Sequence, residues 1–161
     1  MNQSSSQPRE AASRGIELQD GVETSKPVVL IVDDDATSRL ALAAMIAPDE
    51  YHIVFATDAA ELRRRLESIH PDVIVCDLVM EGMNGDEFIR WLQGHDLWRL
   101  VPVVGVTRLD NHIVRTDLML AGADSVLSKP CNGAELRAHV RAALRTREKY
   151  KELECGIGTI P

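Results

Sequence analysis

Several residue types and patterns are scarce or absent in this chain of 161 residues. Aromatic residues make up only 4% of it, so the core must be built from aliphatic side chains. The three cysteines show no CxxC spacing and the five histidines show no ligand spacing, which argues against a zinc site and a disulfide framework. No apolar run approaches the ~20 residues of a membrane span, and the first residues lack the apolar segment of a secretion signal.

A net positive charge is also missing. The formal net charge is −7, whereas proteins that coat nucleic acid or membranes need clustered Lys and Arg to meet phosphates. We therefore expect no direct contact with nucleic acid or membrane. The odd number of cysteines fits a reducing compartment, and we expect a cytoplasmic protein.

The length suffices for one domain with a sizeable core. Residues 1–26 are polar and without periodicity, which predicts a disordered tail. The domain is predicted over residues 27–147. Residues 148–161 are predicted to be a helix extension and linker, which is either a solvated helix end or a coiled-coil-like stalk.

Five short apolar runs rich in Val and Ile predict strands. The runs are Val28–Val32, His52–Ala56, Val73–Cys76, Val103–Val106 and Val126–Ser128. Continuous apolar runs suit strands that are buried on both faces, as in a parallel sheet. Helix patterns alternate with them, so the fold class is α/β, with a five-stranded parallel sheet flanked by five helices.

The helix patterns come with capping signals. Asp58 and Asp110 are predicted to begin two helices, and Gly122 is predicted to end the second of these. The apolar face of the first helix is predicted to contain Leu40, Ala43, Ala44 and Ala47. The apolar face of the last is predicted to contain Leu136, Val140, Ala143 and Leu144.

Polar side chains follow four of the predicted strands. Asp33 and Asp34 follow the first, and the third, fourth and fifth end in Asp77, Thr107 and Lys129. The carboxyl ends of parallel strands meet at one edge of a sheet, where two carboxylates ~4 Å apart repel by about 4 kcal/mol. Oxygen ligands without His or Cys suit Mg²⁺, so the set predicts a phosphoryl-handling site.

Five separated segments resemble the response-regulator receiver family of two-component signalling. They are Val29–Asp35, Asp72–Met80, Gly82–Gly85, Val103–Thr107 and Ala121–Asp124 followed by Lys129-Pro130. Their order and spacing match the family from about Pro27 to Arg147. The resemblance implies a flavodoxin-like strand order of 2-1-3-4-5.

The resemblance also implies roles for individual residues. Asp77 would accept the phosphoryl group, and Mg²⁺ would be held by Asp33, Asp34, Asp77 and the backbone carbonyl of Val79. Thr107 would turn toward the phosphoryl group, and Lys129 would pair with it, ahead of a cis peptide bond to Pro130.

The resemblance further implies partners. The donor would be a sensor histidine kinase or a phosphotransfer protein, and a downstream output protein or domain would read the switch. The chain itself would be no enzyme, and a homodimer stays open.

Three positions depart from the family pattern. Arg108 replaces a small residue after Thr107, Val126 stands where a switching aromatic is common, and Glu81 replaces a proline. We hypothesise that Arg108 slows loss of the phosphoryl group. Asp35 is expected to be exposed.

Two alternatives remain. One is a receiver-shaped docking module that acts without phosphorylation; the complete acidic set argues against it, and the departures at Arg108 and Val126 keep it open. The other is a haloacid-dehalogenase-like phosphatase, because Asp33-x-Asp35-x-Thr37 resembles its nucleophile motif. That family also needs a further acidic pair at a later strand end, and no such pair follows Lys129 in this sequence.

Overall fold

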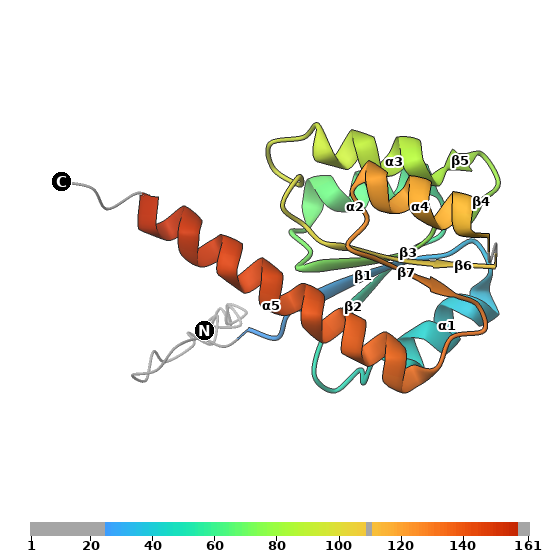
Figure 1. Cartoon of the computed structure of the whole chain (residues 1–161). Coiled ribbons are helices and arrows are strands. Elements are labelled where there is room, and N and C mark those ends of the chain that lie inside the picture. The colour runs from blue at the N-terminus through green and yellow to red at the C-terminus, as the bar shows by residue number, and fades with distance from the viewer. Residues whose placement is uncertain (1–24, 109–110, 158–161) are drawn as a thin grey trace, which may run out of the picture.

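The computed structural model describes residues 25–108 and 111–157, in which strands and helices alternate (Figure 1). The elements are β1 (Val28–Val32), α1 (Ala36–Met45), β2 (His52–Ala56), α2 (Ala59–Ser68), β3 (Val73–Asp77), β4 (Val79–Met80), β5 (Met83–Asn84), α3 (Gly85–Gln93), β6 (Val103–Thr107), α4 (His112–Ala121), β7 (Ser125–Ser128) and α5 (Gly133–Ile157). The predicted tail over residues 1–26 falls almost wholly outside the described residues.

The five long strands form one parallel sheet in the order β2-β1-β3-β6-β7. This confirms the predicted α/β fold and the order 2-1-3-4-5, counted over the strands of this sheet. Every residue of β3 and β6 is buried, as their continuous apolar sequences predict. The antiparallel hairpin of β4 and β5 is an addition that the sequence pattern did not reveal.

Helices cover both faces of the sheet, with α2, α3 and α4 on one side and α1 and α5 on the other (Figure 1). Two aliphatic cores result, one on each face. The first contains Leu62, Leu66, Phe88, Ile89, Leu92 and Leu118 from its helices. The second contains Leu42, Ile46, Leu136, Val140, Ala143 and Leu144. The predicted inner face of the last helix is therefore confirmed.

The helix caps largely follow the predictions. The Asp58 side chain accepts a hydrogen bond from the Glu61 backbone N–H, which confirms this residue as the cap of α2. Gly122 ends α4 with a left-handed φ of 119°. Asn111 caps α4 by accepting from the Ile113 backbone N–H, and the predicted cap Asp110 lies outside the described residues.

The predicted inner face of α1 is wrong except for Ala43, which packs against the core. Leu40 is 64% exposed and Ala44 is also exposed, whereas Leu42 and Ile46 are buried against the sheet. Two bulky side chains four residues apart bury more apolar surface than a stripe of alanines does, so they determine which face of the helix packs against the sheet. Ala47, predicted on the inner face, lies beyond the helix at φ 68°.

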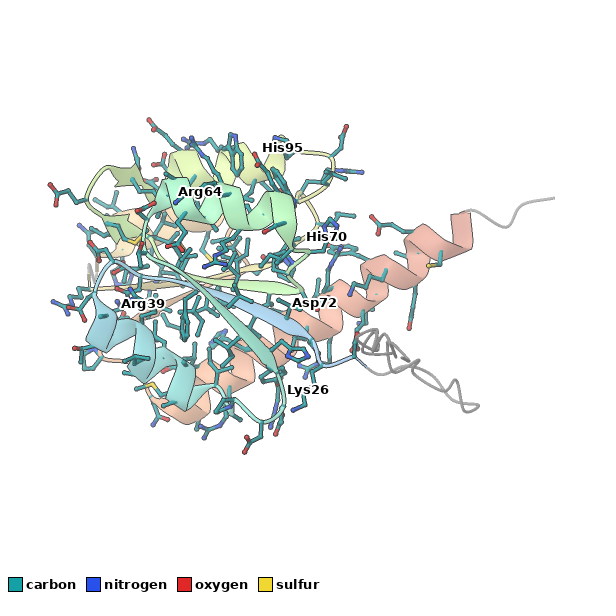
Figure 2. The ribbon with its side chains drawn as sticks, turned by 180° about the vertical axis from the view of Figure 1, so that it is seen from behind. Lys26, Arg39, Arg64, His70, Asp72 and His95 are labelled. Carbon is teal, nitrogen blue, oxygen red and sulfur yellow. The ribbon has the colours of Figure 1, made fainter. Side chains whose placement is uncertain are left out.

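Helix α5 continues past the domain through Ile157 (Figure 1). Lys151 forms an ion pair with Asp72, which precedes β3 at the end of the sheet next to α5 (Figure 2). Beyond this contact the helix surface is solvated, and Leu153 is 62% exposed. Among the described helices, none combines the length and the apolar character needed to cross a membrane.

Candidate functional site

The parallel register brings the predicted site residues to one edge of the sheet. Val32 pairs with Cys76, so Asp33 follows β1 beside Asp77 at the end of β3. Asp77 in turn pairs with Val106, and Thr107 pairs with Ser128, the residue before Lys129. Strand pairing alone therefore gathers these side chains from four separate segments of the chain.

Lys129 is the centre of this cluster. Its ammonium donates to the Oδ2 atoms of Asp33 at 2.6 Å and of Asp77 at 3.1 Å. The Asp33 side chain is fully buried, and the Lys129 side chain is only 10% exposed. Such a buried ion pair is stable only when further hydrogen bonds satisfy the charged atoms.

Ser38 supplies one of those hydrogen bonds and was missed by the sequence analysis. Its hydroxyl donates to Asp33 Oδ2 at 2.6 Å and accepts from Lys129 Nζ at 2.8 Å. Asp35 caps α1 by accepting a hydrogen bond from the Ser38 backbone N–H at 2.7 Å. This cap fixes the first turn of α1, in which the Ser38 side chain faces the site. The exposed position of Asp35 agrees with the expectation.

Backbone groups complete the surroundings of Asp33. Its Oδ1 accepts from the Asp35 backbone N–H at 2.9 Å, and its own carbonyl accepts from the Arg39 guanidinium at 2.8 Å. Arg39 lies on α1 at the functional end of the sheet (Figure 2). Both carboxylate oxygens of Asp33 thus have donors in place.

These contacts shift the pKa values of the buried pair. Burial raises the pKa of Asp33, but hydrogen bonds from Lys129, Ser38 and the Asp35 backbone hold it below its usual value. Burial lowers the pKa of Lys129, but its bonds to Asp33 and Asp77 bring it above its usual value. Both groups are therefore charged at neutral pH.

Asp34 completes a group of three carboxylates. One oxygen from each of Asp33, Asp34 and Asp77 lies within 4.8 Å of the others. Among the described residues Asp34 has no hydrogen-bond partner and is exposed, in contrast to Asp33. An all-oxygen set of this size fits Mg²⁺, with Asp34 as the readily available ligand.

Asp77 is held by the loop that follows it. Its Oδ1 accepts from the Val79 backbone N–H at 3.0 Å. Leu78 packs so closely that a Cβ on Gly105 would lie 2.4 Å from its Cδ1, and one on Gly85 2.5 Å from its carbonyl oxygen. Two glycines therefore allow the backbone after Asp77 to take this position.

The remaining predicted residues lie at the same edge. Thr107 is 2% exposed, and its carbonyl accepts from the Lys129 backbone N–H at 2.8 Å. The peptide bond between Lys129 and Pro130 is cis, as expected. Val126 is buried in β7, and Glu81 is exposed in the turn between β4 and β5.

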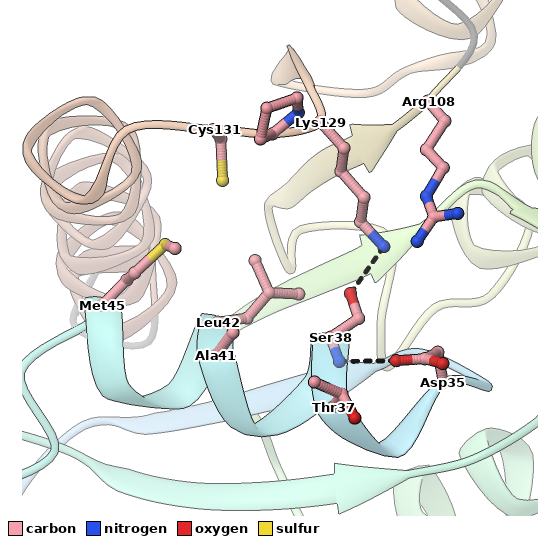
Figure 3. A pocket seen from close by; sticks show the side chains of 10 residues that line it. Asp35, Thr37, Ser38, Ala41, Leu42, Met45, Arg108, Lys129 and Cys131 are labelled. Carbon is pink, nitrogen blue, oxygen red and sulfur yellow. Dashed lines mark hydrogen bonds between the residues drawn. The ribbon is translucent and has the colours of Figure 1, made fainter.

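Two adjoining hollows open at this edge. An acidic cavity of about 330 Å³ is lined by Asp33, Asp34, Asp35, Asp77, Val79, Arg108 and Lys129. An apolar groove of about 500 Å³ runs beside it between α1 and the segment after β7, where Leu42, Met45 and Cys131 face one another (Figure 3). Arg108 and Lys129 line both hollows.

Known proteins share this architecture. A family model described as the response regulator receiver domain matches residues 29–141. The response regulator MprA of Mycobacterium tuberculosis is 35% identical over 119 residues, which are 73% of this chain and 50% of MprA. The hybrid signal transduction histidine kinase D of Dictyostelium discoideum is 30% identical over 128 residues, 80% of this chain and 8% of the kinase. The chain thus spans half of one curated relative and a small part of the other.

Solved structures agree with these sequence matches. A putative response regulator from Chloroflexus aurantiacus superimposes with a TM-score of 0.71 at 26% identity, covering 75% of this chain and 99% of that one. The signal receiver domain of a histidine kinase from Syntrophus aciditrophicus gives 0.67 at 30% identity, covering 74% and 90%.

Proposed function

The chain belongs to the response regulator receiver domain family, and from this premise we propose that Asp77 accepts a phosphoryl group in a Mg²⁺-dependent reaction. The observation that carries the proposal is the contact of Lys129 with both Asp33 and Asp77 at the sheet edge, next to the exposed carboxylate of Asp34. Acidic groups and one lysine around an open cavity form a site for an anionic group and a hard cation.

The proposed transfer is a substitution at phosphorus. An oxygen of Asp77 forms a bond to the phosphorus while the bond to the donor breaks, and the donor keeps that electron pair. The expected donor is a phosphohistidine of a sensor kinase or phosphotransfer protein. Lys129 offsets the charge on the phosphoryl oxygens from its position at 3.1 Å from Asp77.

The metal would be held by Asp34 and Asp77, with Asp33 and the carbonyl of Val79 completing the set of protein ligands. When bound, Mg²⁺ supplies neutralisation of the negative charge that gathers on the transferred group. The hydrogen bonds on both oxygens of Asp33 favour a further role for it in orienting Lys129.

We further propose that the chain is a switch rather than an enzyme. The new phosphoryl oxygens would draw in Thr107, which is buried beside the site, and bias the surface that a downstream output partner reads. We assign it no direct contact with nucleic acid, and a homodimer stays open. We propose a cytoplasmic location, which is consistent with Cys76, Cys131 and Cys155 forming no disulfide within the described residues.

A docking module that works without phosphorylation is the second candidate. Val126 and Arg108 favour it, because Val126 stands where a switching aromatic is common in the family and Arg108 stands where a small residue is usual. The phosphatase alternative is less well supported, because Asp33, the first residue of its nucleophile motif, is fully buried and bound by Lys129 and Ser38, and Asp35 caps α1.

Intact mass measurement tests the proposal. The wild-type protein and Asp77→Asn are incubated with acetyl phosphate, with and without Mg²⁺. We expect the mass of one phosphoryl group on the wild type only, and only when Mg²⁺ is present. Equal labelling of both proteins would reject Asp77 as the acceptor, and labelling of neither would favour the docking module.

A further inference from the structure

Arg108 is the cation at the mouth of the acidic cavity whose role the proposed reaction leaves open. It directly follows Thr107 at the end of β6 and lines the cavity together with Asp34, Asp77 and Lys129. Its guanidinium extends beside the ammonium of Lys129, above the start of α1 (Figure 3). This side chain is exposed, and within residues 25–108 and 111–157 it has no ion-pair or hydrogen-bond partner.

The two cations of the cavity differ in their contacts. Lys129 already donates to Asp33, Ser38 and Asp77. Arg108 has no such contact within the described residues, although carboxylates line the same cavity and a guanidinium carries five N–H donors. An arginine fork binds two oxygens of a carboxylate or of a phosphoryl group. Both Asp77 oxygens already accept hydrogen bonds from Val79 and Lys129, whereas a phosphoryl group on Asp77 adds three acceptor oxygens.

Charge balance indicates when Arg108 gains a partner. Four aspartates line the cavity against Lys129 and Arg108, and a bound Mg²⁺ would bring these groups to neutrality. Phosphorylation replaces the single charge of Asp77 with a phosphoryl group that carries more negative charge and three acceptor oxygens. Among the described residues the guanidinium of Arg108 is the lining cation whose N–H donors have no partner, so it can donate to these oxygens.

We propose that Arg108 is a second cationic contact of the phosphoryl group on Asp77 and that this contact retards hydrolysis; the inference rests on the proposed function. In hydrolysis, the oxygen of a water molecule bonds to phosphorus, the bond to the Asp77 oxygen breaks, and the carboxylate keeps the electron pair. The water protons pass to the released phosphate and to solvent. The attacking water must come from the open side of the cavity, where Arg108 lies, because in-line displacement requires the side opposite Asp77.

The decay of the phosphorylated protein tests this contact. Wild type, Arg108→Ala, Arg108→Met and Arg108→Lys are phosphorylated, freed of donor, and followed by intact mass in Mg²⁺. We expect Arg108→Ala and Arg108→Met to shorten the half-life of the phosphorylated protein by about three- to fivefold, in keeping with an exposed charge contact. Arg108→Lys should retain part of the protection. Arg99→Ala is the matched control, because Arg99 is also exposed but lines a separate cavity with Asp124 and Tyr150.

The variants separate a charge contact from an effect of side-chain bulk. If phosphorylated Arg108→Met decays as slowly as the wild type, side-chain bulk at the cavity mouth accounts for the slow decay and the charge contact is rejected. If Arg108→Ala decays at the wild-type rate, the inference fails while the proposed function stands. If the wild type takes up no phosphoryl group, both fail.

Calorimetry on the unphosphorylated chain gives an independent measurement. Removing a positive charge from the cavity should let Arg108→Ala bind Mg²⁺ about two- to threefold more tightly than the wild type. The thermal midpoint without metal should fall only slightly, since Arg108 has no hydrogen bond or ion pair to lose among the described residues. An unaltered Mg²⁺ affinity would show that the guanidinium does not act on this cavity, and would overturn the inference.

Discussion

The ammonium of Lys129 lies 2.6 Å from Asp33 Oδ2, although 96 positions separate the two residues in the chain. This contact joins the segment after β7 to the end of β1 across the strand that carries Asp77. Because the Asp33 side chain is fully buried, the contact contributes both to the stability of the fold and to the charge of the site.

Lys129→Met should therefore lower the stability of the unphosphorylated protein, independently of any phosphoryl transfer. Loss of the cation leaves Asp33 buried beside Asp77, and we expect about 3 kcal/mol less free energy of unfolding in urea without metal. Mg²⁺ should recover part of this loss by neutralising the same carboxylates. Lys151→Met removes an exposed ion pair and should cost less than about 1 kcal/mol. Equal losses of unfolding free energy in Lys129→Met and Lys151→Met would contradict the assignment of Lys129 to a buried ion pair.

Ser38→Ala tests the side chain that only the structure revealed. The change removes a donor to Asp33 and an acceptor for Lys129, and we expect a loss of about 1 kcal/mol in the free energy of unfolding. The rate of phosphorylation should also fall, because Lys129 loses one of the groups that hold it. Ser68→Ala, on the solvent side of α2, should change neither measurement.

The stability of the protein should depend on pH through Asp33. Burial raises the pKa of this carboxyl, but the hydrogen bonds from Lys129, Ser38 and Asp35 bring it below 3.8. The folded state thus binds the proton less tightly than the unfolded state, so the stabilisation is present above the unfolded value and is lost as pH falls through the folded value. Below about pH 4, the free energy of unfolding of the wild type should fall more steeply than that of Asp33→Asn. Parallel curves in urea titrations without metal would refute this.

Mg²⁺ affinity should distinguish two adjacent aspartates. Asp34 has no hydrogen-bond partner among the described residues, whereas Asp35 accepts from the backbone of α1. Asp34→Asn should weaken Mg²⁺ binding by at least about tenfold in calorimetry, because a hard cation loses a charged ligand. Asp35→Asn keeps the helix cap and should stay within about twofold of the wild type. If Asp35→Asn weakened Mg²⁺ binding more than Asp34→Asn does, the ion would lie nearer to Asp35.

The sequence predicted the parts of this protein that follow from local pattern. The strands are short apolar runs, and the residues after them meet because parallel strands end at one edge. The side chains that support the site depend on tertiary geometry. Ser38 and Arg39 reach Asp33 only because α1 starts at the Asp35 cap, and a serine in a first turn gives no sign of such a partner.

The error on α1 has a related cause. A pattern of small and large apolar residues allows several inner faces, and packing against α5 and the sheet selects the one with Leu42 and Ile46. The hairpin of β4 and β5 was missed because strands of two residues carry no periodicity.

The length of α5 gives the molecule a mechanical property. The helix begins at Gly133, four residues after Lys129, and its 25 residues make a rod of ~37 Å at 1.5 Å per residue. Leu136, Val140, Ala143 and Leu144 fix the first part of this rod to the sheet, so residues 145–157, ~20 Å long, stand beyond the core. The ion pair between Lys151 and Asp72 fastens that extension at the end of the sheet opposite the cavity, so bending of the extension is resisted at a point remote from the site.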